Sequence, residues 1–496
     1  MTVHGLLSAA AQARPEAMLV VDGAARVSYG EIEERAGRIA HLLRTVGVRR
    51  GDRVGLLLPN SARYVSAYFG ILRAGAVAVP LHTGQVAASL AASLADCGAT
   101  ALVVGDGAAL ASARGAAPMV PSLRTILTEA MEREASPVDP PADVHADDPA
   151  VIVYTSGSTG KPRGAVLRHG NVVANTRSIV RYLELRREDR AVLVLPFPYV
   201  YGASVLHTHV AVGGSLVLHG STVFPNKILD AIAEHEATGF AGVPSTFAIL
   251  LHRSDIATRR FPTLRYVTQA GGPMPPAHVR RLVEALPGTR VIVMYGATEA
   301  SARLTWLPPE HLERKLGSIG VPIPDVELKI LREDGSEAEV DEVGEIVASG
   351  PNIMAGYWGD PAATAEVLDA AGFHTGDLGR RDADGFFWVV GRKREMIKSG
   401  AHRISPREIE DVLLLDPAVE EAAVVGRPDE VLGEVVVAHV TARPGQHPSP
   451  EALKRLCQAN LAAAKVPVAI HVREAMPRNA AGKVDKLALR ATASAG

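Results

Sequence analysis

A short run of small and hydroxylated residues that ends in a lysine is the part of this sequence best suited to chemistry. The run extends from Thr155 to Lys161 and follows a β-branched apolar stretch, Val151–Tyr154, that is typical of a buried strand. Glycines let a backbone approach an anion closely, hydroxyls add donors, and the lysine adds positive charge. The pattern predicts a phosphate-binding loop, although a plain hydrophilic turn has a similar composition. Its predicted ligands are Thr155, Ser156, Gly157, Ser158, Thr159, Gly160 and Lys161.

The phosphate loop of the P-loop nucleotidases does not describe this run. That motif needs a glycine five residues before the glycine of its Gly-Lys pair and a serine or threonine directly after the pair. Here Thr155 stands at the first position and Pro162 at the second. The ordered string TSGSTGKPRG instead resembles the phosphate loop of the adenylate-forming superfamily, which includes acyl-CoA synthetases, adenylation domains of nonribosomal peptide synthetases and luciferases.

Length and composition limit the alternatives. A chain of 496 residues is too long for one core and predicts two or more domains. The formal net charge of −2 gives no indication of a nucleic-acid partner. The two cysteines, Cys97 and Cys457, are too few for a disulfide framework and fit a reducing compartment. The sequence shows neither a signal peptide nor an apolar stretch of membrane length, so a cytoplasmic protein without a membrane span is expected.

Apolar strands alternate with helical patterns through the N-terminal part of the sequence. This alternation is typical of parallel α/β layers. Ser28 precedes an amphipathic helical pattern that Gly47 ends. After the phosphate loop, four further strands are each followed by a turn that carries glycine, proline, hydroxyl or acidic residues. Because parallel strands place such turns at one edge of a sheet, we expect the four turns to line one cleft with the phosphate loop.

The rest of the sequence is different in character. Asp-Gly turn signals at Asp334 and Asp384 predict a β-rich subdomain over about 316–392. Farther on, Ser405 is expected to cap a helix, with Glu408 completing a capping box.

The predicted fold class is α/β, with two domains. Residues 1–392 form a large N-terminal domain of layered α/β subdomains that includes the β-rich subdomain. Residues 393–496 form a small α+β C-terminal domain. The family resemblance implies that this small domain is mobile and rotates between two half-reactions.

The segment YGATEA resembles the nucleotide site of the family. Glu299 is interpreted as the Mg²⁺ anchor, because a carboxylate beside a triphosphate is repelled unless a metal bridges them. Its structural alternative is an acidic residue that stabilises a helix N-terminus. Thr298 is expected to donate to the α-phosphate. The resemblance also assigns nucleotide contacts to Gly271, Gly272, Tyr295, Gly296 and Ala297.

The resemblance continues toward the C-terminus. Asp377, in FHTGDLG, and Arg392 match the family residues that bind the ribose hydroxyls. Lys483, in PRNAAGKVDK, matches the lysine that stabilises negative charge on the α-phosphate during adenylation. Arg394 stands at the family's hinge position, where aspartate or lysine is common. Lys398 is expected to face the thiol acceptor. Taken singly, each of these residues could also be an ordinary surface charge or turn residue.

The acid pocket is the expected source of specificity. Gly202 stands where amino-acid-activating relatives carry an aspartate for the substrate ammonium, so an α-amino acid substrate is disfavoured. Tyr199 stands where acyl-CoA synthetases often carry a histidine. Each candidate pocket residue could equally belong to the core or its rim. The candidates are Tyr199, Tyr201, Gly202, His207 and Ser245.

The resemblance implies an ATP- and Mg²⁺-dependent ligase. Such an enzyme converts a carboxylic acid into an acyl adenylate, releases pyrophosphate, and transfers the acyl group to the thiol of CoA or of phosphopantetheine on a separate carrier protein. Two alternatives stay open: an amine or another nucleophile as the acceptor, and a non-catalytic nucleotide-binding relative. The second is disfavoured because Lys483, Asp377 and Glu299 are all present.

Overall fold

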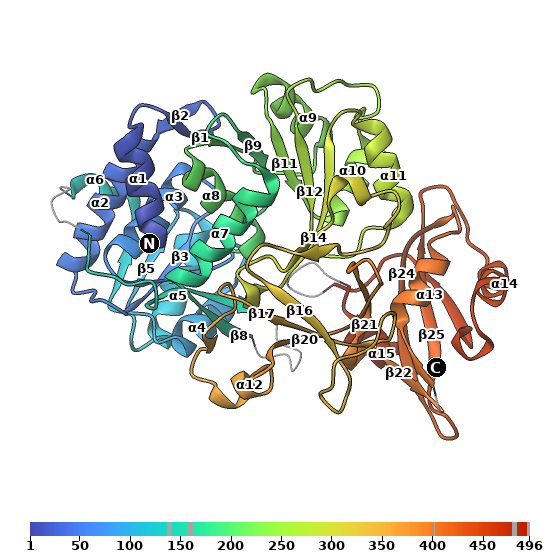
Figure 1. The fold of residues 1–496 in the computed structure, drawn as a ribbon. Coiled ribbons are helices and arrows are strands. Elements are labelled where there is room, and N and C mark those ends of the chain that lie inside the picture. The colour runs from blue at the N-terminus through green and yellow to red at the C-terminus, as the bar shows by residue number, and fades with distance from the viewer. Residues whose placement is uncertain (136–140, 156–161, 401, 479–483, 494–496) are drawn as a thin grey trace. The chain divides into compact units, whose positions relative to one another are not determined.

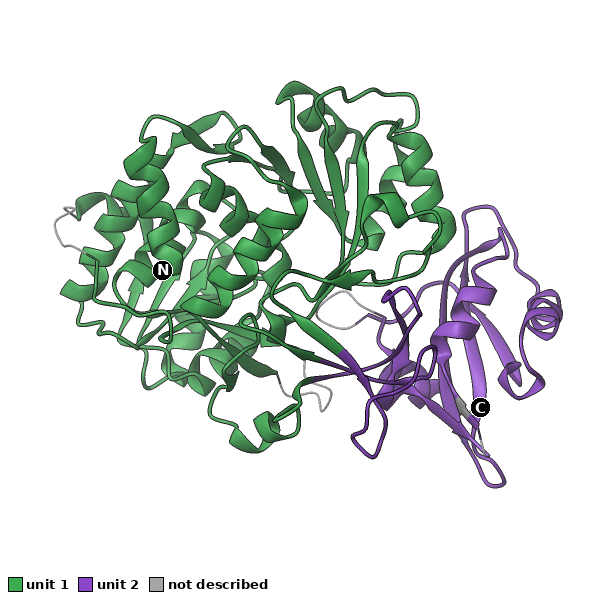
Figure 2. Cartoon of the chain, in the orientation of Figure 1, with its two compact units in different colours: residues 1–328, 348–373 green, residues 329–347, 374–496 purple. Residues whose placement is uncertain are grey.

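The computed structural model describes residues 1–135, 141–155, 162–400, 402–478 and 484–493. The chain forms two compact units (Figure 2). The larger unit contains residues 1–328 and 348–373, and the smaller unit contains 329–347 and 374–496. The domain boundary predicted after residue 392 remains a prediction. None of the described helices is long and apolar enough to cross a membrane.

The larger unit contains two extended sheets. The first sheet includes the strands labelled β9, β11 and β12 in Figure 1. Its order is β15-β14-β13-β12-β11-β9-β10-β1-β2. The strands from β13 to β1 in this order run parallel, whereas the pairs β1–β2, β13–β14 and β14–β15 are antiparallel. Their bounds are β1 (Met18–Asp22), β2 (Ala25–Ser28), β9 (Arg190–Leu193), β10 (Ser215–Leu218), β11 (Gly239–Gly242), β12 (Tyr266–Gln269), β13 (Arg290–Tyr295), β14 (Thr305–Trp306) and β15 (Val321–Pro322).

The second sheet of the larger unit carries the predicted phosphate loop. Its order is β18-β8-β7-β4-β3-β5-β6, and β8 is antiparallel to both of its neighbours, β7 and β18, whereas the other pairs are parallel. The central strands are buried on both faces, which explains their continuous apolar sequence. The bounds are β3 (Arg53–Leu57), β4 (Val77–Pro80), β5 (Ala101–Val104), β6 (Thr125–Leu127), β7 (Pro149–Thr155), β8 (Arg163–Arg168) and β18 (Gly356–Tyr357).

A layer of helices packs between the two sheets. Helix α3 contacts β1 of the first sheet and β3 and β4 of the second, α7 contacts β7 and β8, and α8 contacts β9 and β10. This layer consists of α1 (Val3–Ala13), α2 (Tyr29–Thr45), α3 (Ala62–Arg73), α7 (His169–Leu183) and α8 (Val200–Val212). The predicted layered α/β architecture is confirmed.

Further helices cover the outer faces of these sheets. Helices α9 (Pro225–Glu234), α10 (Pro244–Arg253) and α11 (Pro276–Ala285) lie on the first sheet. Helices α4 (Ala87–Asp96) and α5 (Ala108–Ala116) lie on the second. Other short elements of the unit include α6 (Glu129–Glu134), α12 (Pro361–Ala365) and β19 (Leu368–Asp369).

The smaller unit combines a β-rich part with a mixed part. The β-rich part has the order β16-β17-β20, with β21 beside β20, and the mixed part has the order β23-β22-β25-β24, with β26 parallel to β25. The bounds are β16 (Glu327–Leu331), β17 (Gly344–Ser349), β20 (Gly372–Arg381), β21 (Phe387–Arg392), β22 (Ile397–Ser399), β23 (His402–Ile404), β24 (Val419–Asp429), β25 (Gly433–Ala442), β26 (Ala469–Arg473), α13 (Pro406–Leu413), α14 (Pro450–Asn460) and α15 (Lys486–Ala493).

Two helix starts test the capping predictions. Ser28 caps α2: its Oγ accepts from the Glu31 N–H at 3.2 Å, and the Glu31 carboxylate accepts from the Ser28 N–H at 2.7 Å. The capping box predicted at Ser405 is wrong. The Ser405 hydroxyl makes no bond to the first turn of α13 and donates instead to the Val390 carbonyl at 2.5 Å. The spacing of Ser405 and Glu408 predicted a bond within the helix, but the Ser405 hydroxyl bonds to a carbonyl 15 residues earlier in the chain.

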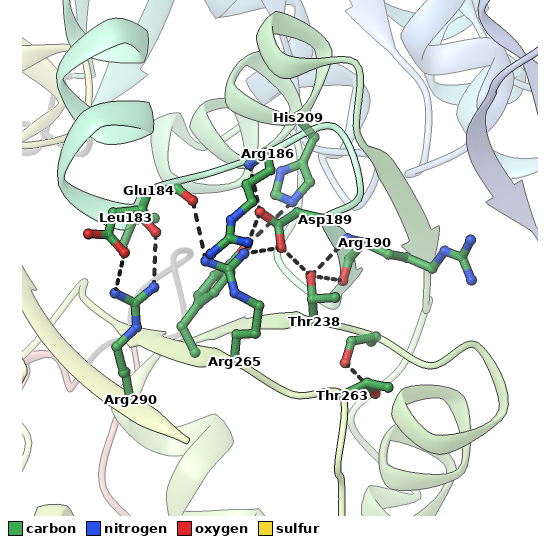
Figure 3. Close-up of polar contacts among 12 residues, drawn as sticks. Leu183, Glu184, Arg186, Asp189, Arg190, His209, Thr238, Thr263, Arg265 and Arg290 are labelled. Carbon is green, nitrogen blue, oxygen red and sulfur yellow. Dashed lines mark hydrogen bonds and ion pairs between the residues drawn. The ribbon is translucent and has the colours of Figure 1, made fainter. Parts of the chain in front are cut away.

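A buried carboxylate, Asp189, joins segments near the start of β9, β11 and β12 (Figure 3). Asp189 is 1% exposed. It accepts from Arg265 Nη1 at 2.5 and 2.7 Å, from Thr238 Oγ1 at 2.7 Å and from the Arg186 N–H at 2.7 Å. Burial opposes ionisation of Asp189, but the bonds from Arg265, Arg186 and Thr238 outweigh it and lower the pKa of the carboxyl group.

We expect Asp189→Asn to lower the free energy of unfolding by about 3 kcal/mol, because Arg265 keeps its charge in a partly buried place without a carboxylate partner. The pKa of Asp189 is lower in the folded state than in the unfolded state. The ionised carboxylate therefore contributes fully to the free energy of unfolding above the unfolded-state pKa of about 4. This contribution disappears as the pH falls through the folded-state pKa. Urea unfolding at a series of pH values measures both effects. Equal unfolding free energies for variant and wild type at neutral pH would contradict this assignment.

Candidate active site

The hairpin of β7 and β8 holds the two ends of the predicted phosphate loop. Thr155 lies opposite Arg163 in the antiparallel register, and the Thr155 hydroxyl donates to the Arg163 carbonyl at 3.3 Å. The strand predicted over 151–154 is confirmed as part of β7. The other predicted ligands, from Ser156 to Lys161, lie outside the described residues.

The four turns lie at one edge of the first sheet, as expected, whereas the cleft that they were predicted to line with the phosphate loop remains a prediction. Strands β9, β11, β12 and β13 are parallel neighbours, so their carboxyl ends lie at the same edge. Tyr199, Ser245, Gly271 and Tyr295 follow or end these four strands in turn. Tyr199 is 42% exposed, and Ser245 and Gly271 are also exposed, so three of these turns present groups to solvent.

The turn after β13 carries Thr298 and Glu299. Glu299 Oε1 accepts a hydrogen bond from the Tyr357 hydroxyl at 2.8 Å, and the Glu299 carbonyl accepts from the Met354 N–H at 2.7 Å. Burial, together with the Glu299 charge, raises the pKa of Tyr357, so the phenol remains a donor at neutral pH. Tyr357 therefore orients the carboxylate of Glu299. The two side chains are 58 residues apart in the sequence, so local patterns could not reveal this contact.

The donors present fit a magnesium ion held mainly by its substrate. In the part of the chain that the structure describes, no group of three or more His, Cys, Asp or Glu side chains could hold a metal. Mg²⁺ in nucleotide enzymes is commonly bound by one or two carboxylates together with substrate phosphates. Glu299 is partly exposed and has one carboxylate oxygen fixed by Tyr357, so it matches this mode.

Asp377 and Arg392 face each other across the hairpin of β20 and β21 in the smaller unit. They are register partners, and Arg392 Nε lies 3.1 Å from Asp377 Oδ1. The Asp377 residue is 6% exposed, whereas the Arg392 side chain is 49% exposed. The Thr375 hydroxyl accepts from the Asp377 N–H at 3.1 Å and fixes the backbone there. The pair thus presents a buried acceptor beside an accessible cation.

The remaining predicted residues of the smaller unit occupy different settings. Arg394 lies in a single 3₁₀ turn, Lys393–Glu395, and is exposed. Lys398 lies in β22 with an exposed side chain. Lys483 lies outside the described residues.

The two flanks of the segment that contains Lys483 are anchored. Arg478 and Val484 form an antiparallel bridge across it. Lys486, at the start of α15, places its Nζ 3.0 Å from Glu395 Oε2 and 2.9 Å from Glu410 Oε1. Burial opposes protonation of Lys486, but the two carboxylates outweigh it and raise the pKa of the ammonium. Local sequence spacing could not reveal this triad, because its carboxylates come from distant segments.

Helix α8 separates two cavities of the larger unit. The first has a volume of about 20 Å³, room for about one water molecule, and is lined by Tyr64, Tyr68, Phe197 and His207 among others. His207 Nε2 lies 3.0 Å from the Tyr68 hydroxyl, and burial lowers the pKa of His207 to about 3, so the ring is neutral. The second cavity also has a volume of about 20 Å³ and reaches Arg303. Tyr201 donates its hydroxyl to the Thr268 carbonyl at 2.8 Å on this side.

Gly202 faces main chain rather than open space. A Cβ atom at this position would lie 2.3 Å from the Pro196 carbonyl oxygen, which no real side chain tolerates. The aspartate of amino-acid-activating relatives therefore has no room on this backbone. The expectation that an α-amino acid substrate is disfavoured remains a prediction.

Two family models match the chain. The model described as AMP-binding enzyme matches residues 7–358, and the model described as AMP-binding enzyme C-terminal domain matches residues 408–483. The fold and these matches define an adenylate-forming enzyme of the acyl-CoA synthetase type. The chain belongs to the AMP-binding enzyme family.

Similar proteins cover almost the whole chain. A feruloyl-CoA synthase from Amycolatopsis sp. is 36% identical over 96% of this chain and 96% of its own length. A 2-succinylbenzoate–CoA ligase from Geobacillus sp. is 33% identical over 95% of this chain and 93% of its own length.

Solved structures agree with this assignment. The o-succinylbenzoate CoA synthetase of Bacillus subtilis in complex with ATP and magnesium ion is similar with a TM-score of 0.89, at 32% identity, over 98% of both chains. The anthranilate CoA ligase AuaEII in complex with anthranoyl-AMP gives a TM-score of 0.93 at 27% identity, over 100% of this chain and 98% of that one.

Proposed function

We propose that this chain is an AMP-forming acid–CoA ligase. In the first half-reaction a carboxylate oxygen of the acid attacks the α-phosphorus of ATP, and the bond to the β-phosphate breaks with release of pyrophosphate. In the second, the thiolate of CoA attacks the acyl carbon and AMP leaves. The observation that carries the proposal is full-length similarity to acid–CoA ligases together with the Thr298–Glu299 turn at the shared edge of β9, β11, β12 and β13.

The chain's own groups have distinct tasks in the first half-reaction. We assign Glu299, oriented by Tyr357, to hold magnesium, which would neutralise charge on the phosphates. Thr298 donates to the α-phosphate, and the turn glycines and Tyr295 bind the adenine. The loop from Thr155 to Lys161 binds the leaving phosphates through backbone N–H groups, hydroxyls and one ammonium.

The smaller unit supplies the other nucleotide contacts. Asp377 accepts from the ribose hydroxyls, and Arg392 both orients this carboxylate and donates to the ribose. Lys483 stabilises charge on the α-phosphate during adenylation. Lys398 faces the thiol acceptor after the small domain has turned about Arg394. CoA is the acceptor that the similar enzymes favour, and a carrier-protein phosphopantetheine is the second candidate in a cytoplasmic setting.

Acid-dependent pyrophosphate release tests the proposal. The purified chain is incubated with ATP, Mg²⁺ and a panel of aromatic, aliphatic, dicarboxylic and amino acids, with and without CoA. We expect at least one acid to release pyrophosphate and to yield AMP and an acyl-CoA in equal amounts when CoA is present. Absence of release with every acid, or release without AMP, would contradict the proposal.

Asp377→Asn tests the ribose assignment. We expect the KM for ATP to rise about tenfold to a hundredfold, because a neutral amide cannot accept charge-assisted bonds from two hydroxyls. The KM for the acid should change little. Asp384→Asn, on the exposed turn of the same hairpin, is the matched control and should leave both values unchanged. Steady-state kinetics with varied ATP measures the effect, and an unchanged KM for ATP in Asp377→Asn would refute the role.

A further inference from the structure

Glu345 is a largely buried carboxylate that the proposed catalytic roles do not use. It lies on β17, the strand that pairs with β20 in the β-rich part of the smaller unit. Its side chain is only 12% exposed. Burying a carboxylate is costly unless it accepts hydrogen bonds and meets positive charge, so its contacts indicate what it holds in place.

One oxygen of Glu345 fixes the main chain beside the predicted ribose acceptor. Glu345 Oε1 accepts from the Gly376 N–H at 3.2 Å, and Gly376 directly precedes Asp377. Gly376 has a φ of 70°, in the left-handed region that glycine occupies without a steric penalty. The carboxylate therefore holds the bend in β20 that sets the position of Asp377.

The residue after Glu345 on β17 adds a second contact to the same bend. The Ile346 carbonyl accepts from the Thr375 hydroxyl at 2.8 Å, and this hydroxyl accepts from the Asp377 N–H at 3.1 Å. Two consecutive residues of β17 thus hold residues 375–377. The main chain of Asp377 is fixed by β17 and not only by its own hairpin.

The other oxygen of Glu345 binds the end of the strand that carries the arginine of the pair. Glu345 Oε2 accepts from Lys393 Nζ at 2.9 Å, and Lys393 directly follows Arg392. His374 Nδ1 lies 3.3 Å from the same oxygen. Burial opposes ionisation of Glu345, but the bonds from Lys393 and His374 outweigh it and lower the pKa of the carboxyl group, so it is ionised at neutral pH.

These contacts make Glu345 a bridge between the two strands of the Asp377–Arg392 pair. It binds the residue before Asp377 on β20 and the residue after Arg392 at the end of β21. Groups that recognise two adjacent hydroxyls must be held to within about 0.5 Å, which requires support from the residues around them. Glu345 supplies such support to both members of the pair at once.

We propose that Glu345 is a positioning residue for the ribose of ATP: it holds Asp377 and Arg392 in the arrangement that recognises the two ribose hydroxyls. This inference rests on the proposed function, which assigns the ribose to this pair. It predicts that the choice between nucleotides with and without ribose hydroxyls depends on a side chain outside the pair.

Binding of two nucleotides tests the inference without any acid substrate. Calorimetry gives the dissociation constants of ATP and of 2′,3′-dideoxy-ATP, each with Mg²⁺. We expect the wild type to bind ATP about 30-fold more tightly, as charge-assisted hydrogen bonds to the hydroxyls allow. Glu345→Ala should reduce this ratio to about threefold by weakening ATP binding alone. Glu345→Gln should keep an intermediate ratio, because its amide oxygen can still accept from the Gly376 N–H.

Glu342→Ala is the matched control. Glu342 also accepts from a cation, Arg332 Nη2 at 2.5 Å, and from a main-chain N–H, that of Glu339 at 2.8 Å. These partners are not chain neighbours of Asp377 or Arg392. Glu342→Ala should keep the wild-type ratio even where its melting temperature falls, because a loss of stability alone weakens the binding of both nucleotides equally.

A double variant shows whether Glu345 acts through the pair. We expect Glu345→Ala combined with Asp377→Asn to bind ATP within about threefold of Asp377→Asn alone, because a positioning residue has little effect once the group it positions is lost. Losses that multiply in the double variant would overturn the inference. An unchanged ratio in Glu345→Ala, or a wild type that binds both nucleotides equally, would do the same.

The inference and the proposed function can fail separately. If no acid releases pyrophosphate while the nucleotide ratio depends on Glu345, the ligase function fails and the positioning role stands. If an acid releases pyrophosphate and Glu345→Ala keeps the wild-type ratio, the function stands and the positioning role fails.

Discussion

Lys483→Ala is expected to lower the rate of acid-dependent pyrophosphate release by about a thousandfold, because one positioned donor at a developing anion contributes about that much. ATP binding should stay within about fivefold of the wild type, since the lysine acts on charge that develops during the reaction. The expectation rests on the PRNAAGKVDK signature and on the anchors at Arg478 and Lys486. Rapid-quench kinetics measures the rate of adenylate formation, and an equilibrium binding assay measures the dissociation constant for ATP.

The two half-reactions give this prediction its internal control. Lys483→Ala should convert a chemically prepared acyl adenylate and CoA into the thioester at nearly the wild-type rate, because that step needs no charge stabilisation at the α-phosphate of ATP. Lys227→Ala, at a lysine that is exposed on the larger unit, should retain both half-reactions. Unimpaired adenylation in Lys483→Ala would exclude the lysine from the catalytic role.

Glu299→Gln is expected to lower the adenylation rate about a hundredfold and to raise the Mg²⁺ concentration needed for half-maximal activity by tenfold or more. The substitution keeps the size of the side chain and an oxygen that can accept from Tyr357, and it removes the negative charge. A lower adenylation rate in this variant would therefore reflect weaker Mg²⁺ binding rather than altered packing. Magnesium titrations of the steady-state rate measure both quantities.

Tyr357→Phe separates the orientation of the Glu299 carboxylate from its charge. It keeps the ring and removes the hydroxyl that holds Glu299 Oε1 at 2.8 Å. We expect a loss of about tenfold, because the carboxylate keeps its charge and loses only its orientation. A magnesium dependence that is the same in wild type and Glu299→Gln would show that the metal is held elsewhere.

Local patterns predicted much of the scaffold. Apolar β-branched runs identified β7 and the parallel strands, and serine, proline and glycine marked helix ends, because these signals act over a few residues. The position of the turns at one sheet edge followed from the topology of parallel strands. The motif at Thr298 and Glu299 and the Asp377–Arg392 pair were identified by resemblance, and the structure adds their partners.

What the sequence could not predict depends on contacts between distant segments. The Ser405 hydroxyl donates to the Val390 carbonyl rather than to its own helix. Lys486 forms ion pairs with the carboxylates of Glu395 and Glu410. The burial of Arg303 beside Tyr201 likewise follows from packing, since an isolated arginine in a sequence suggests an exposed surface residue.

The central claim is that this chain joins AMP to a carboxylic acid and then passes the acyl group to a thiol. Mass spectrometry of the chain incubated with ATP, Mg²⁺ and a mixed pool of acids tests it directly. We predict one or a few acyl adenylates that disappear on addition of CoA as AMP and the matching acyl-CoA appear. Absence of any adenylate from the whole pool, or adenylates that neither CoA nor a phosphopantetheine carrier consumes, would contradict the account.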